Sequence, residues 1–176
     1  MLPTAQLNNT PPPTIMHPAP PAIRPVIRDD LPALKSIIDA VGLFPSAMLD
    51  DMLRPYLTAA PDCRHRWITD GHSEPSALAF FAPEPMTSGT WNVYLLAVDP
   101  RRQRTGRGTA MVSFIERTLA RLGERIVLVE TSGLPDFEPT RAFYRRIGYT
   151  EEARIRDFYR VGEDKVVFRK ALQPAT

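Results

Sequence analysis

Residues 93–122 read VYLLAVDPRRQRTGRGTAMVSFIERTLARL. An apolar strand, residues 93–98, runs into a basic turn that contains glycine, and the turn opens directly into a helix. The first N–H groups of a helix have no partner inside the helix, and the helix dipole places positive charge at the same end. The stretch therefore predicts a binding site for an anionic group such as a phosphate.

The composition is that of an ordinary globular protein. Of the 176 residues, 43% are hydrophobic and 24% are charged, which suits one domain. The formal net charge of +2 is too small to indicate nucleic-acid binding. No apolar run approaches the ~20 residues that cross a bilayer, and the N-terminus lacks a signal-peptide pattern. We therefore expect a cytoplasmic protein without nucleic-acid or membrane partners.

Cysteine and histidine are too sparse to indicate metal or thiol chemistry. Cys63 is the one cysteine of the chain, so neither an internal disulfide nor a thiolate metal cluster can form. His17, His65 and His72 show no pairing motif with Cys63 and no metal-ligand spacing. We expect no metal, and a buried or half-buried thiol at Cys63.

The N-terminal segment has a different composition from the rest of the chain. Residues 1–22 hold seven of the 19 prolines, and proline fixes φ and removes a backbone donor. This predicts a disordered or polyproline-like tail over residues 1–22, with Met16 as an alternative translation start. The remaining chain is predicted to form one domain, residues 23–172, and a short C-terminal tail, residues 173–176.

Hydrophobic periodicity and turn residues predict seven strands and four helices. The strands are expected at 23–27, 64–69, 76–81, 91–98, 125–131, 151–159 and 165–170, and the helices at 31–41, 47–57, 107–122 and 139–147. Strand, helix and strand through residues 93–131 imply a parallel pair with a right-handed crossover. The fold class is thus mixed α/β: a mostly antiparallel sheet of about seven strands, helices on both faces, and one parallel pair at the basic turn.

The two glycines of the turn are weak evidence when taken alone. Gly106 and Gly108 permit close backbone approach and left-handed dihedrals. A dinucleotide-binding motif would need a third glycine, where Met111 stands, and a P-loop would need Gly-Lys-Ser/Thr. On the glycines alone, a structural turn with a solvated basic rim is an equal alternative.

Two motifs in the expected order resemble one family. The segment 103–108, QRTGRG, resembles the Gln-x-x-Gly-x-Gly signature of the GNAT superfamily of acetyl-coenzyme A-dependent N-acetyltransferases. The segment 142–149, AFYRRIGY, resembles the family's second segment, in which a tyrosine precedes Gly-aromatic. Residues 157–170 resemble the ending of the branch related to ribosomal-protein alanine acetyltransferases. The resemblance covers about residues 23–172 and implies the GNAT fold and acetyl-CoA as co-substrate.

The resemblance also implies roles for particular residues. The end of the strand is expected to offer backbone groups to the acetyl-pantetheine arm, through Leu96, Ala97 and Val98. The turn is expected to hold the pyrophosphate, through Gln103, Arg104, Thr105, Gly106, Arg107 and Gly108. Tyr144 matches the tyrosine that donates a proton to the departing thiolate, a role that suits a nearby O–H donor.

Amine acetylation also requires a base, because an ammonium group cannot attack a thioester. Glu130 ends an otherwise apolar strand, where burial would make its carboxylate a stronger base. The glutamate on the matching strand is the base in the alanine-acetyltransferase branch. Here the segment 131–143 is about two residues longer, and Phe137 stands where many relatives have Asn. Glu84, Asp99 or a water molecule are therefore alternative bases.

The acceptor amine is expected across the sheet from the coenzyme. Its predicted surroundings are aromatic: Phe44, Trp91, Tyr94 and Tyr159. Nearby acidic residues could attract a cationic amine, namely Glu84, Asp157, Glu163 and Asp164. A small-molecule amine or amino-acid-like acceptor is the first hypothesis. A protein N-terminal or lysine amine, a non-catalytic acetyl-CoA-binding regulatory module, and a homodimer stay open.

Overall fold

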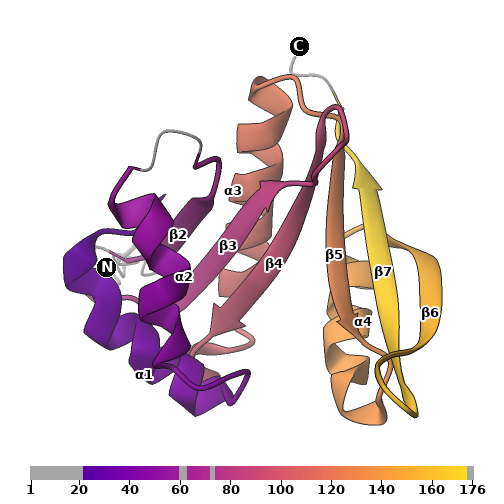
Figure 1. Cartoon of the computed structure of the whole chain (residues 1–176), viewed down its shortest axis with the longest axis horizontal. Helices are drawn as coiled ribbons and strands as arrows, with labels where there is room; N and C mark the ends of the chain where they lie inside the picture. The colour runs from indigo at the N-terminus through magenta and orange to yellow at the C-terminus, as the bar shows by residue number, and fades with distance from the viewer. Residues whose placement is uncertain (1–21, 60–62, 72–73, 174–176) are drawn as a thin grey trace, which may run out of the picture.

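The computed structural model describes residues 22–59, 63–71 and 74–173. Within them lies a seven-stranded sheet in the order β1-β2-β3-β4-β5-β7-β6 (Figure 1). The strands are β1 (Ile23–Pro25), β2 (Arg66–Asp70), β3 (Ala77–Pro83), β4 (Thr90–Val98), β5 (Ile126–Ser132), β6 (Thr150–Arg160) and β7 (Glu163–Ala171). Only the β4–β5 pair is parallel, and the other five pairs are antiparallel. The predicted fold class is confirmed. The predicted N-terminal tail, residues 1–22, and C-terminal tail, residues 173–176, lie outside the described residues except for residues 22 and 173.

Helices cover both faces of the sheet, as Figure 1 shows. They are α1 (Leu31–Val41), α2 (Met48–Leu57), α3 (Arg107–Arg121) and α4 (Glu138–Arg146), with short 3-10 turns η1 (Arg28–Asp30), η2 (Pro100–Arg102) and η3 (Pro135–Phe137). One apolar core packs α1 and α2 against β2, β3 and β4. The other core packs α3 and α4 against β2 to β5 and β7. The sheet therefore separates two cores.

The strand period of two assigns neighbouring residues to different cores. Trp67 lies in the α1–α2 core, whereas Ile68 lies in the α3–α4 core. On α1, Leu34 and Ile38 stand four residues apart and are both fully buried, as the hydrophobic periodicity of a helix predicts. Each such side chain contributes about 1.5–3 kcal/mol through burial. Met48 is the exception, since it stands at the start of α2 with 52% of its surface exposed.

Two acidic residues differ from what the local pattern indicates. Asp30 stands at the N-cap position of α1, but its side chain forms no capping hydrogen bond. Its carboxylate instead pairs with Arg24 at 2.7 Å and accepts the Ile27 N–H at 2.8 Å, because η1 turns it toward β1. The Asp70-Gly71 pair is a hairpin signal, and the antiparallel pairing of β2 with β3 confirms the hairpin, but Asp70 is the last residue of β2 and is fully buried.

The sheet opens between β4 and β5. These strands pair only where residues 90–93 face residues 126–129. On the other side of β4, the register with β3 shifts so that Val93 faces Phe81 and Leu95 faces Phe80, which leaves Tyr94 as a bulge residue. Bulges are frequent beside active sites. Past Val93, no described strand pairs with the β5-facing edge of β4, and the two strands diverge in Figure 1.

Candidate active site

The basic turn folds back onto the end of β4. Asp99 caps η2, since its carboxylate accepts the Arg101 N–H at 2.9 Å. Gln103 donates from Nε2 to the Val98 carbonyl at 3.2 Å. Gly106 is the N-cap residue of α3. The open N–H groups of the first turn of α3 are thereby directed to the end of β4.

The two glycines of the turn are needed for different reasons. Gly106 has φ of 82°, the left-handed region that a side chain rarely adopts. Gly108 is helical, so the expectation of a left-handed dihedral was wrong there. A Cβ at Gly108 would lie 3.4 Å from the Phe143 ring and 3.9 Å from Val98 Cγ2. Gly108 thus lets α3, α4 and the end of β4 meet.

The two arginines beside Gly106 lie in different environments. Arg104 is exposed, and no hydrogen bond or ion pair within the described ranges engages its side chain. It is therefore available to a phosphate. Arg107 forms an ion pair with the fully buried Asp70. The predicted phosphate contact of Arg107 stays a prediction, and Asp70 already engages one nitrogen of that guanidinium.

Tyr144 lies on α4 inside an aromatic cluster. Its ring centroid is 5.0 Å from Phe143, 5.6 Å from Tyr149 and 5.8 Å from Phe168. The residue is 4% exposed, and burial raises the pKa of its hydroxyl. The phenol therefore keeps its proton at neutral pH, as a proton donor must. Phe143 links it to Gly108 and so to the basic turn.

Glu130 lies on the opposite face of β5 from Val129 and forms an ion pair. Lys165 donates from Nζ to Glu130 Oε2 at 3.0 Å, and the Glu130 side chain keeps 31% of its surface exposed. The expected apolar surroundings are thus replaced by a cation. Sequence reasoning missed Lys165, because no local signal links a β7 residue to β5.

The charge of Glu130 acts on both Tyr94 and Tyr159. Burial raises the pKa of the Tyr94 hydroxyl first, followed by its hydrogen bond to Glu84 and the charges of Glu84 and Glu130. Burial, followed by the charge of Glu130, raises the pKa of the Tyr159 hydroxyl. Tyr94 is 48% exposed and Tyr159 is 46% exposed, so both rings are open to solvent. A carboxylate near accessible aromatic rings can bind an amine and take up its proton.

The alternative bases differ in availability. The Arg101 guanidinium, followed by the Arg101 N–H, lowers the pKa of Asp99, which makes that carboxylate a weak base. Glu84 accepts from the Tyr94 hydroxyl at 3.1 Å and from Asn92 Nδ2 at 3.4 Å. Because it adjoins Tyr94, Glu84 stays an alternative to Glu130.

The remaining predicted acceptor residues lie elsewhere. Trp91 is 2% exposed and packs near Phe81 in the α3–α4 core. The prediction for Trp91 is therefore corrected: its side chain faces away from Tyr94, because the strand alternates. Phe44 lies between α1 and α2 and packs partly buried against their core, and its contact with an acceptor stays a prediction.

Three acidic residues of the β6–β7 hairpin hold the hairpin itself. Asp157 accepts the Gly162 N–H at 2.7 Å. Asp164 accepts the Asp157 N–H at 3.1 Å, and it also pairs with Arg154 at 3.3 Å. Glu163 pairs with Arg160 at 2.8 Å. Their predicted attraction for a cationic amine is thus weakened, because each carboxylate already has an internal partner.

Arg141 joins β5 to α4 and was missed in the sequence. It is 5% exposed, and its Nη1 donates to the Ser132 carbonyl at 2.6 Å and to the Leu134 carbonyl at 2.9 Å. These bonds fix the long segment between Glu130 and Tyr144. An arginine on an amphipathic helix usually faces solvent, so the sequence did not indicate that Arg141 is buried and binds two carbonyl groups.

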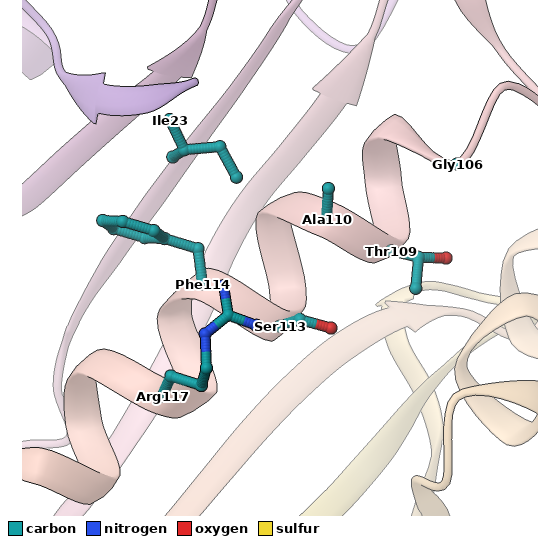
Figure 2. A pocket seen from close by; sticks show the side chains of 7 residues that line it. All are labelled: Ile23, Gly106, Thr109, Ala110, Ser113, Phe114 and Arg117. Atoms are coloured by element: carbon teal, nitrogen blue, oxygen red, sulfur yellow. The ribbon is translucent and has the colours of Figure 1, made fainter. Parts of the chain in front are cut away.

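A hollow of about 630 Å³ follows the outer side of α3 (Figure 2). It is lined by Ile23, Gly106, Thr109, Ala110, Ser113, Phe114 and Arg117. Gly106 is the one predicted site residue among them, so this hollow is not where Glu130 or Tyr144 would act.

Metal sites and membrane-spanning helices were also sought among the described residues. No group of three or more His, Cys, Asp or Glu side chains in that part of the chain could hold a metal ion. None of its helices is long and apolar enough to span a membrane. Cys63 is half-buried and forms no disulfide.

The chain is similar to known acetyltransferases. Residues 67–151 match the family model of the acetyltransferase (GNAT) domain. A GNAT-family acetyltransferase from Desulfovibrio desulfuricans superposes with a TM-score of 0.81 and 28% identity, over 86% of this chain and 99% of that chain. No curated protein matches the sequence.

Two further solved structures share the fold at lower identity. The ribosomal-protein-S18-alanine N-acetyltransferase from Escherichia coli has a TM-score of 0.68 and 20% identity, over 88% of this chain and 96% of that chain. An aminoglycoside 6'-N-acetyltransferase complexed with coenzyme A has a TM-score of 0.68 and 14% identity, over 88% and 99%. Residues 67–151 thus match the GNAT acetyltransferase domain, both motifs lie within that range, and the described chain has the GNAT fold.

Proposed function

We propose that the protein transfers the acetyl group of acetyl-CoA to the primary amine of a small molecule, by direct attack in a ternary complex. The observation that carries the proposal is the opening between β4 and β5. Past Val93 the free edge of β4 can hydrogen-bond an extended arm as a further strand would. The glycine turn and the N-terminus of α3 stand at the end of that edge.

The residues present suit acetyl-CoA. A Cβ at Gly106 would meet nothing within 4 Å, so the surface there is open to a ligand. Arg104 and the first N–H groups of α3 would hold the pyrophosphate. Leu96, Ala97 and Val98 would hold the pantetheine arm through their backbone. A relative complexed with coenzyme A supports the same ligand.

The chemistry divides between two side chains. Glu130, directly or through water, takes the proton from the ammonium group, which frees the nitrogen lone pair. The nitrogen then bonds to the thioester carbonyl carbon, and the C–S bond breaks. Tyr144 gives its proton to the departing thiolate. The acetylated nitrogen then loses its remaining excess proton, which restores the Tyr144 hydroxyl directly or through water. The products are an N-acetyl amide and coenzyme A, and no metal is required.

A protein amine is the second candidate acceptor. Phe158 is 49% exposed, and its ring lies 3.8 Å from Lys165 Nζ, beside Glu130. An exposed aromatic hairpin at this position could receive a peptide segment. The shared fold with the S18-alanine acetyltransferase also favours this candidate. A third candidate, a non-catalytic acetyl-CoA sensor, is disfavoured by the presence of both Tyr144 and Glu130.

The test is amine-dependent release of thiol from acetyl-CoA, with binding followed separately by calorimetry. The panel contains diamines, aminoglycosides, amino acids, and peptides with a free N-terminus or an internal lysine. Turnover of small amines with kcat/KM above that of peptides is expected. Faster turnover of peptides would reassign the acceptor. Binding of acetyl-CoA without turnover of any amine would favour the sensor.

A further inference from the structure

We propose that Asp70 is a positioning residue that holds the coenzyme turn, residues 99–107, from behind. The inference rests on the proposed function, because it assigns that turn to acetyl-CoA. Asp70 ends β2, two strands away from β4 in the sheet. Nothing in the sequence pattern links it to the glycine motif.

Asp70 is a fully buried carboxylate with several donors. It accepts the Ser76 N–H at 2.8 Å, the Ser76 hydroxyl at 2.8 Å and the Ala77 N–H at 2.6 Å. Its other partner is the guanidinium of Arg107, the first residue of α3. Charge-assisted bonds of this kind are among the strongest in proteins. Asp70 thereby joins the β2–β3 connection to the start of α3.

The same connection also holds the other end of the turn. Asp99 follows the last residue of β4, and its N–H donates to the Ser76 carbonyl at 2.8 Å. Ser76 is itself fixed by the Asp70 carboxylate. Both ends of the coenzyme turn, Asp99 and Arg107, are thus anchored to two buried and mutually bonded residues, Ser76 and Asp70. Rotation of the turn away from β4 would break one anchor or the other.

This arrangement matters for phosphate binding because the main donors are backbone N–H groups. Their usefulness depends on direction, and donors that are fixed before the ligand arrives bind it more tightly. It also gives the two arginines different roles. Arg107 neutralises Asp70 and orients α3, whereas Arg104 supplies positive charge to the ligand.

The experiment measures acetyl-CoA affinity by calorimetry, and steady-state KM and kcat, for Asp70→Asn, Arg107→Met and the matched control Arg104→Ala. Asp70→Asn should raise the Kd and KM for acetyl-CoA about 10–100-fold, as expected for a displaced binding group. The kcat at saturating acetyl-CoA and the KM for the amine should stay within about twofold. A general loss of folded protein would not produce that split.

Double variants separate positioning from direct contact. The losses from Asp70→Asn and Arg107→Met should not add, because both break one ion pair, whereas the losses from Asp70→Asn and Arg104→Ala should add. Wild-type affinity in folded Asp70→Asn, or additive losses with Arg107→Met, would overturn the inference. If Asp70→Asn does not fold, Ser76→Ala removes one of its donors and should weaken acetyl-CoA binding in the same direction. Unchanged affinity there would also overturn it.

Acetyl-CoA binding by the wild-type protein distinguishes failure of the role of Asp70 from failure of the proposed function. If the wild type binds acetyl-CoA and folded Asp70→Asn binds equally well, only the role of Asp70 fails. If the wild type does not bind acetyl-CoA at all, the proposed function fails, and the role of Asp70 fails with it.

Discussion

At the scale of the residue, Tyr144 and Tyr149 form a natural comparison. Both are buried in one aromatic cluster, and burial raises the pKa of each hydroxyl. Tyr144→Phe should lower kcat about 10²–10⁴-fold, the usual contribution of a general acid, with unchanged affinity for acetyl-CoA. Tyr149→Phe removes a hydroxyl from the same cluster and should keep most of the turnover. Equal turnover in both variants would exclude Tyr144 from the reaction.

The raised pKa of Tyr144 also fixes the sign of a pH effect. A phenol with a raised pKa stays protonated to higher pH, so the proton donor is not lost across the neutral and mildly alkaline range. Below about pH 10, deprotonation of Tyr144 should therefore cause no fall in the wild-type kcat. The wild-type and Tyr144→Phe profiles should keep the same shape over that range. A fall near pH 8 that disappears in that variant would contradict the assignment.

Glu130 is tested by removing its charge while keeping its shape. Glu130→Gln should lower kcat at neutral pH about 10²–10⁴-fold, because the amide cannot accept the proton. Glu84→Gln is the matched comparison, since Glu84 accepts a hydrogen bond from Tyr94, and it should keep most of the turnover. Near wild-type kcat in Glu130→Gln with a large loss in Glu84→Gln would reassign the base.

At the scale of the element, the start of α3 depends on one close contact. A Cβ at Gly108 would lie 3.4 Å from Phe143, so a methyl group just fits and a branched side chain does not. Gly108→Ala should weaken acetyl-CoA binding mildly, whereas Gly108→Val should abolish it while the protein stays folded. Calorimetry and thermal unfolding check the two effects separately. Unchanged affinity in Gly108→Val would count against the turn as the pyrophosphate site.

The segment between β5 and α4 depends on a buried arginine that lies outside it. Its extra length over the family pattern is accommodated by η3 and by the two carbonyls that Arg141 binds. The helix boundaries followed from Pro139 and Gly148, and the structure has them within one residue of the prediction. Local signals thus located the element, but not the buried arginine that ties it to β5.

At the scale of the whole molecule, the edge strand β1 is joined to α1 through Asp30. The Arg24 guanidinium, assisted by the Ile27 N–H, lowers the pKa of Asp30. A lowered pKa adds stability above the unfolded value of about 3.9, and this stability is lost as pH falls through the folded pKa. Asp30→Asn should therefore lower the free energy of unfolding by about 1–3 kcal/mol at neutral pH.

The pH dependence separates this ion pair from general packing. The difference between wild type and Asp30→Asn in urea unfolding should begin to shrink below about pH 4, where the unfolded carboxyl takes up a proton, and should be lost as pH falls through the lower pKa of the folded state. Asp29→Asn, at an exposed neighbouring position, is the control and should behave as wild type at both pH values. A difference that persists unchanged in acid would assign the effect to packing.

The sequence by itself determined the elements, their order and the parallel pair, because periodicity, proline and glycine act within a few residues. It also located the basic turn, residues 99–107, and Tyr144, since each belongs to a contiguous motif. Only the tertiary structure decided which charged side chains form ion pairs with each other. Asp70 with Arg107 and Glu130 with Lys165 are separated by 37 and 35 positions in the chain. Their pairing depends on strand order and on which face each side chain occupies. The same cause removed Trp91 from the acceptor surface, because the face of a strand residue follows from register, which no local pattern encodes.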